Sequence, residues 1–104
     1  IHDHAKQSCW MKVLTGKAEE KIYSYKLEQD FSEVKLLKTH SLDAPGFVYI
    51  DDNVGIHQVQ NIGTENMITM HLYAKPIREC RRYNLADAET SWASFNNDYQ
   101  LKFN

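Results

Sequence analysis

The chain has 104 residues, of which 42% are apolar and 25% charged, and its formal net charge is −2. This length fits one small domain with a modest core. The weak net charge argues against partners bound mainly by electrostatics, such as nucleic acid or an anionic membrane surface. No apolar stretch approaches the roughly 20 residues that span a bilayer, and two cysteines do not make a disulfide framework. We therefore expect a cytoplasmic protein.

The first predicted element is a short extended segment that contains His2 and His4. Successive side chains of a strand point to opposite faces, so these two imidazoles point the same way. Two imidazoles on one face can bind a single metal ion with little rearrangement. Residues 5–8 must then reorient the backbone, because Cys9 lies an odd number of residues beyond His4.

The next stretch predicts a series of strands. Residues 9–15 are rich in strand-forming side chains, and Gly16 predicts a hairpin that leads to a second strand over residues 22–25. The charged run 17–21 between them is expected to face solvent. A further strand is expected over residues 31–40, although this stretch also suits a turn of helix.

The second half of the chain continues the pattern. Residues 42–46 predict a turn, because Pro-Gly is a strong local breaker. A short buried strand is expected over residues 47–50, followed by a polar loop over residues 51–55. His57 then lies in an alternating, strand-like segment, and another strand is expected over residues 67–73.

That last strand carries an unusual face. Thr69, His71 and Tyr73 share one side, and the apolar residues that alternate with them are expected to be ordinary core. A polar stripe of this kind normally points to water or to a functional site.

Many short strands separated by turns, with no convincing long helix, predict an all-β barrel or sandwich. Residues 80–83 and 91–104 contain aromatic and apolar side chains at short spacings and are expected to supply the closing strands. We expect one domain over residues 1–104.

Three histidines are candidate metal ligands. His2, His4 and His57 would offer neutral imidazole nitrogens, which suit zinc, iron, copper or nickel better than calcium or magnesium. His40 lies outside this pattern and is expected at the surface.

The spacing of these residues resembles the two motifs of the cupin family. The first motif matches residues 2–16 and the second matches residues 46–61, with Asp52 and Val54 in place of the usual proline and glycine. Cys9 stands where many cupins carry a glutamate ligand. This change resembles the cysteine dioxygenase branch of the cupins, which oxidises thiols.

The resemblance implies a cupin-type β-barrel, also called a double-stranded β-helix or jelly roll, with Fe(II) held by His2, His4 and His57. It also implies an enzyme that oxidises L-cysteine with O2 to cysteine sulfinic acid and consumes no separate reductant. Such a protein would need no nucleic acid or membrane partner, and its full-length form is expected to be a monomer.

The resemblance assigns roles to four further residues. Cys9 and Tyr73 match the positions of a thioether cross-link. Tyr73 would orient the bound substrate, His71 would act as a base that touches the Tyr73 hydroxyl, and Thr69 would hold His71.

Three alternatives stay open at this point. The substrate could be another small thiol, 3-mercaptopropionate or cysteamine. A zinc- or nickel-binding cupin would use the same histidines with a metal-bound water. A non-catalytic cupin would keep the barrel alone.

The chain opens inside the first motif, without the glycine that begins it. We therefore expect a fragment that lacks the N-terminal strands and the arginine with which the family binds the substrate carboxylate. Expressed alone, the fragment is expected to bind iron weakly, to aggregate, and to oxidise little cysteine.

Overall fold

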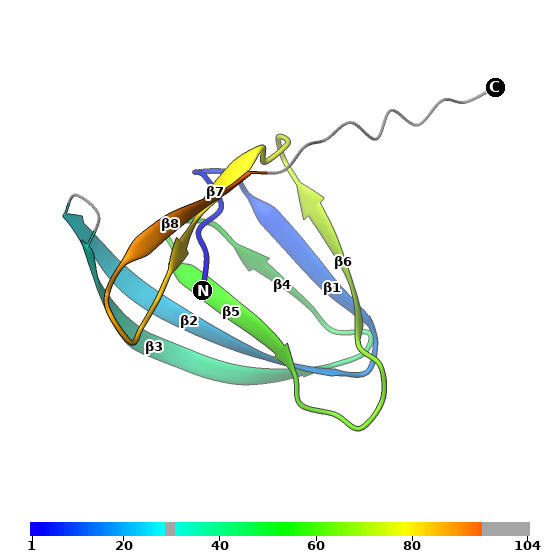
Figure 1. Cartoon of the computed structure of the whole chain (residues 1–104). Coiled ribbons are helices and arrows are strands. Elements are labelled where there is room, and N and C mark those ends of the chain that lie inside the picture. The colour runs from blue at the N-terminus through cyan, green and yellow to red at the C-terminus, as the bar shows by residue number, and fades with distance from the viewer. Residues whose placement is uncertain (29–30, 95–104) are drawn as a thin grey trace.

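The computed structural model describes residues 1–28 and 31–94, and within them the chain is all β. Its strands are β1 (Cys9–Thr15), β2 (Lys17–Glu28), β3 (Phe31–Asp43), β4 (Phe47–Ile50), β5 (Ile56–Asn61), β6 (Ile68–Tyr73), β7 (Glu79–Tyr83) and β8 (Thr90–Ser94). These described residues contain no helix that is long and apolar enough to cross a bilayer. The predicted all-β, cupin-type fold is confirmed (Figure 1). The part of the predicted closing region that falls on residues 95–104 lies outside the described residues.

The strands form three antiparallel sheets, ordered β4-β1-β6, β3-β2-β5 and β7-β8. The N-terminal segment connects two of them, because His2 forms isolated bridges with His57 on β5 and with Arg82 on β7. Figure 1 shows the β4-β1-β6 sheet lying across from the β3-β2-β5 sheet, with the N-terminus beside β5. His57 lies on β5, and His2 is bridged to β5 and β7. Both histidines therefore lie on the side of the fold that faces the β4-β1-β6 sheet.

Gly16 does not form the predicted hairpin. β1 pairs with β4 and β6, whereas β2 pairs with β3 and β5, so the chain changes sheets at Gly16. Gly16 has φ of +82°, and a Cβ atom here would lie 2.9 Å from the carbonyl oxygen of Asn66. Both constraints require glycine at this corner. A sharp turn between two strand-like segments predicts a hairpin, but these two segments pair with strands far along the sequence.

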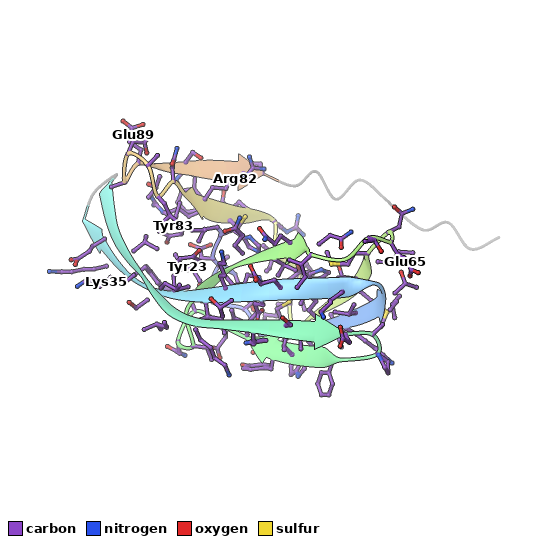
Figure 2. The ribbon with its side chains drawn as sticks, turned by 90° about the horizontal axis from the view of Figure 1, so that it is seen from below. Tyr23, Lys35, Glu65, Arg82, Tyr83 and Glu89 are labelled. Atoms are coloured by element: carbon purple, nitrogen blue, oxygen red, sulfur yellow. The ribbon has the colours of Figure 1, made fainter. Side chains whose placement is uncertain are left out.

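Two buried clusters fill the interior. Cys9, Ile22 and Ile50 pack together from β1, β2 and β4. Tyr23 and Tyr83 belong to a second cluster, and Figure 2 shows these two side chains lying near each other between β2 and β7. Burial of this apolar surface is the main force that holds the sheets together.

The apolar face of β6 is not core, contrary to the prediction. Ile68, Met70 and Leu72 are 53%, 54% and 64% exposed. The alternating Thr-His-Tyr face turns toward Cys9, which places the apolar side chains on the outer face. Thr69 on this face is half-buried, whereas His71 and Tyr73 are exposed as well. Trp10 on β1 is also exposed. On β4, Phe47 and Tyr49 are 66% and 41% exposed, so the expected burial of this strand is wrong at both residues.

Candidate metal centre

The structure brings His2, His4 and His57 together. One ring nitrogen from each lies within 4.8 Å of the others. The ring centroids are 5.2 Å apart for His2 and His4, 4.8 Å for His2 and His57, and 4.6 Å for His4 and His57. His4 and His57 are almost fully buried. Among the described residues, the ring nitrogens of these three histidines are close enough together to bind one metal ion.

Backbone pairing places the first two histidines. The His2 amide donates to the His57 carbonyl at 3.1 Å, and the His57 amide donates back at 3.2 Å. Asp3 points to the opposite side, where its carboxylate accepts from the Arg81 amide at 3.0 Å and from the Tyr83 hydroxyl at 3.2 Å. The strand period then returns His4 to the side of His2, as predicted. The segment is therefore tied down on both edges.

The backbone turns sharply after His4. Ala5 and Lys6 both have positive φ, 48° and 63°, which matches the reorientation predicted for residues 5–8. Asp52 holds this turn, because its two carboxylate oxygens accept from the amides of His4 and Lys6, each at 2.7 Å. One Asp52 oxygen also lies 3.6 Å from His4 Nδ1.

These contacts keep Asp52 ionised. Burial acts to raise the pKa of Asp52, but the His4 ring and the two amide donors outweigh burial and hold that pKa below its usual value. The His4 Nδ1 atom has no hydrogen-bond partner, so Asp52 holds His4 through the backbone amide. Asp52 was noticed in the sequence only as a departure from the cupin motif.

Glu20 is the second carboxylate of the site, and the sequence analysis missed it. Its Oε2 lies 2.7 Å from Nδ1 of His57, and both side chains are 1% exposed. The charged run 17–21 was expected to face solvent, which is wrong for Glu20. Ala18, Glu20 and Ile22 occupy every second position of the strand and therefore share one face, and the apolar Ala18 and Ile22 indicate that this face is buried.

Two of the three imidazoles, those of His2 and His57, have lowered pKa values. Burial, followed by the nearby histidines, lowers the pKa of His2 to about 3. Burial also lowers the pKa of His57, against the opposing effect of the Glu20 hydrogen bond. With a carboxylate at Nδ1, the neutral His57 ring carries its proton there, which leaves the Nε2 lone pair free. That Nε2 lies 3.1 Å from Nε2 of His4. Three imidazole nitrogen donors suit a divalent transition metal.

Cys9 and Tyr73 lie next to each other beside this cluster. They are direct partners in the antiparallel register of β1 and β6. Burial raises the pKa of the Cys9 thiol, and burial together with Cys9 raises the pKa of Tyr73 to about 12. Both groups therefore keep their protons at neutral pH.

The other predicted residues of β6 line up behind Tyr73. His71 Nε2 lies 3.0 Å from the Thr69 hydroxyl, and His71 Nδ1 lies 3.9 Å from the Cys9 sulfur. The His71 and Tyr73 rings are stacked, with centroids 6.3 Å apart and an interplanar angle of 17°. The His71 ring therefore stacks against the Tyr73 ring and forms a hydrogen bond with the Thr69 hydroxyl.

A cavity of about 350 Å³ opens next to the cluster. It is lined by His2, Asp3, His4, Tyr73, Pro76, Ile77 and Cys80. Two metal-ligand candidates and the Tyr73 phenol therefore share one small chamber, large enough for a molecule of amino-acid size. Cys80, which has no predicted catalytic role, is a free buried thiol in its wall.

A cupin-type β fold that carries a three-histidine cluster beside a small cavity defines a metal-dependent cupin. Comparison with known families shows which branch this is. The chain belongs to the cysteine dioxygenase type I family, whose model matches residues 1–86.

Individual relatives agree with this assignment. The chain is 32% identical to cysteine dioxygenase type 1 of Danio rerio, 31% to that of Homo sapiens and 29% to that of Rattus norvegicus, each over 85 residues. Each match covers 81% of this chain and 42% of the relative. The chain thus spans less than half the length of the curated relatives it matches.

Proposed function

We propose that this chain forms the metal-binding part of a non-haem iron dioxygenase that oxidises L-cysteine with O2 to cysteine sulfinic acid. The observation that carries the proposal is that two features lie at the same cavity. Three imidazoles converge at one point, and Tyr73, the cross-strand partner of Cys9, lines the same cavity as His2 and His4. A hydrolytic zinc cupin would need the imidazoles but offers no reason for the Cys9–Tyr73 pair.

The donor set fits Fe(II). His2, His4 and His57 would hold the ion, and none of them adds a negative charge to it. The bound iron would supply a Lewis-acidic centre at which the substrate thiol ionises and reacts with O2. The carboxylates of Asp52 and Glu20 lie behind the ligands and offset part of the positive charge.

The cavity residues would orient the substrate. Tyr73 lines the cavity, and with its pKa raised to about 12 its hydroxyl remains a hydrogen-bond donor throughout the physiological range. His71 and Thr69 would fix the plane of the Tyr73 ring from behind, through the stacking contact and the 3.0 Å hydrogen bond. Burial, followed by the nearby histidines, lowers the pKa of His71, so its ring is a neutral hydrogen-bonding partner.

The overall reaction needs no further cofactor. Both atoms of O2 form bonds to the substrate sulfur, so the sulfur is oxidised as O2 is reduced, and no external reductant is consumed. The proposal includes a thioether link in which a bond from the Cys9 sulfur to the Tyr73 ring replaces the S–H bond and one ring C–H bond, with O2 as the oxidant.

The test combines iron analysis with oxygen uptake on the natural protein that carries this chain. We expect one iron per chain and cysteine-dependent O2 consumption that yields the sulfinic acid. The same assay with 3-mercaptopropionate and cysteamine compares the alternative thiols. Zinc or nickel in place of iron, with no O2 consumption after reconstitution with Fe(II), would contradict the proposal.

A further inference from the structure

Glu20 connects the metal cluster to a residue outside it. Glu20 lies on β2, the central strand of its sheet, and is the direct cross-strand partner of His40 on β3. On the other side, β2 pairs with β5 so that Ile22 lies opposite His57. His57 is therefore the diagonal neighbour of Glu20 on the same face, within reach of its side chain.

Both carboxylate oxygens of Glu20 have an imidazole next to them. Oε2 lies 2.7 Å from His57 Nδ1, and Oε1 lies 3.0 Å from His40 Nε2. The three side chains form a row across three adjacent strands. His40 is not the surface histidine that the sequence predicted, because its side chain is 23% exposed and both its ring nitrogens are buried.

The surroundings explain why such a row is stable. A carboxylate that is 1% exposed loses nearly all its hydration, which is costly unless polar partners replace the water. His57 fills that role at one oxygen through a hydrogen bond, and the His40 ring lies 3.0 Å from the other oxygen without completing a hydrogen bond to it. Without His40, the Oε1 side of the carboxylate would have space to rotate away from His57 or to admit water.

Glu20 is not itself in a position to bind the ion. It contacts Nδ1 of His57, whereas Nε2 of the same ring faces His4 at 3.1 Å. The imidazole ring therefore stands between the carboxylate and the point where the three histidines converge. Any effect of Glu20 on a bound metal must act through His57.

We propose that Glu20 and His40 are positioning residues of the metal centre. Glu20 holds His57 in the tautomer and ring orientation that direct Nε2 toward the other two ligands, and His40 holds Glu20 in that contact. This inference rests on the proposed metal site, but not on the identity of the reaction.

The test uses Co(II), which reports ligand geometry through its visible absorption, and needs no substrate. Glu20→Leu removes the carboxylate and places an apolar side chain in a buried position. We expect the Co(II) dissociation constant to rise about 10- to 100-fold and the visible spectrum to change. The thermal midpoint of the metal-free chain should fall, because the substitution leaves the buried Nδ1–H donor of His57 without its acceptor.

Two matched variants complete the design. Glu19→Gln changes a more exposed carboxylate on the same strand and should leave the affinity and spectrum unchanged. His40→Leu should weaken Co(II) binding in the native background but add little in the Glu20→Leu background, because His40 acts through Glu20. In the metal-free chain, nitrogen-15 NMR should find His57 protonated at Nδ1, and this preference should be lost in Glu20→Leu.

Unchanged affinity and spectrum in Glu20→Leu would overturn the proposal, as would equal effects of His40→Leu in both backgrounds. If the native chain binds no Co(II), the proposed function fails. The NMR experiment then still decides whether Glu20 sets the His57 tautomer.

Discussion

Asp52→Ala is the substitution that most clearly tests how His4 is held in the metal site. The Asp52 carboxylate accepts from the amides of His4 and Lys6, each at 2.7 Å. A hydrogen bond to a charged group contributes about 1.5–3 kcal/mol. The amide of Lys6 lies at an exposed position, so water can replace part of what the substitution removes there. We therefore expect Asp52→Ala to lower the free energy of unfolding of the metal-free chain by about 2–4 kcal/mol.

The same substitution should weaken metal binding. Asp52 orders the backbone on the C-terminal side of His4, and its oxygen lies 3.6 Å from His4 Nδ1. Loss of a carboxylate behind a ligand histidine typically reduces metal affinity about 10- to 100-fold. Urea denaturation measures the first effect and chelator competition measures the second.

Asp43→Asn is the matched control, because the Asp43 side chain is 75% exposed and its partner Lys17 lies 3.8 Å away. A surface pair of this kind contributes at most about 1 kcal/mol. If Asp52→Ala behaves like Asp43→Asn in both assays, the carboxylate does not organise the His4 turn and the reasoning is refuted.

Three further predictions concern the cluster and its neighbours. His57→Ala should abolish stoichiometric iron binding and leave a largely β circular-dichroism spectrum; undiminished iron content would refute the ligand assignment. Cys9→Ser should slow cysteine oxidation without preventing iron binding, and peptide mapping of the native protein after turnover should find Cys9 and Tyr73 joined under reducing conditions. The thermal midpoint of the metal-free chain should fall as pH drops from about 6.5 toward 3. In that window His2 takes up a proton in the unfolded chain but not in the folded chain, where its pKa is lowered to about 3, so acid favours unfolding. The pKa of Asp52 is also lowered in the folded chain and acts in the same direction. A midpoint that rises on acidification would contradict the assigned pKa directions.

The positions of several strands along the sequence were predictable, because these positions depend on local signals. The alternation in residues 9–15 and the turn at Pro45-Gly46 are properties of short segments, and β1 begins and ends where the pattern predicts. The approach of His2 to His4 was also predictable, because it follows from the period of a strand. Their meeting with His57 was inferred from motif spacing, and the structure brings the three rings together.

The parts that could not be predicted depend on pairing between distant segments. Gly16 looks like a hairpin turn, but β1 and β2 pair with other strands. The alternation of Ala18, Glu20 and Ile22 indicates that Glu20 faces inward, but its two imidazole neighbours come from β3 and β5 and depend on distant pairing. The exposure of Met70 likewise follows from which face of β6 points toward the histidines.

The most direct test of the central claim is the fate of O2 in the iron-loaded natural protein. With oxygen-18 gas and L-cysteine, mass spectrometry should find cysteine sulfinic acid that carries two heavy oxygens in the same molecule. The label should depend on iron and be lost in His57→Ala. Product without the label, or labelled product formed equally well by His57→Ala, would contradict a dioxygenase built on His2, His4 and His57.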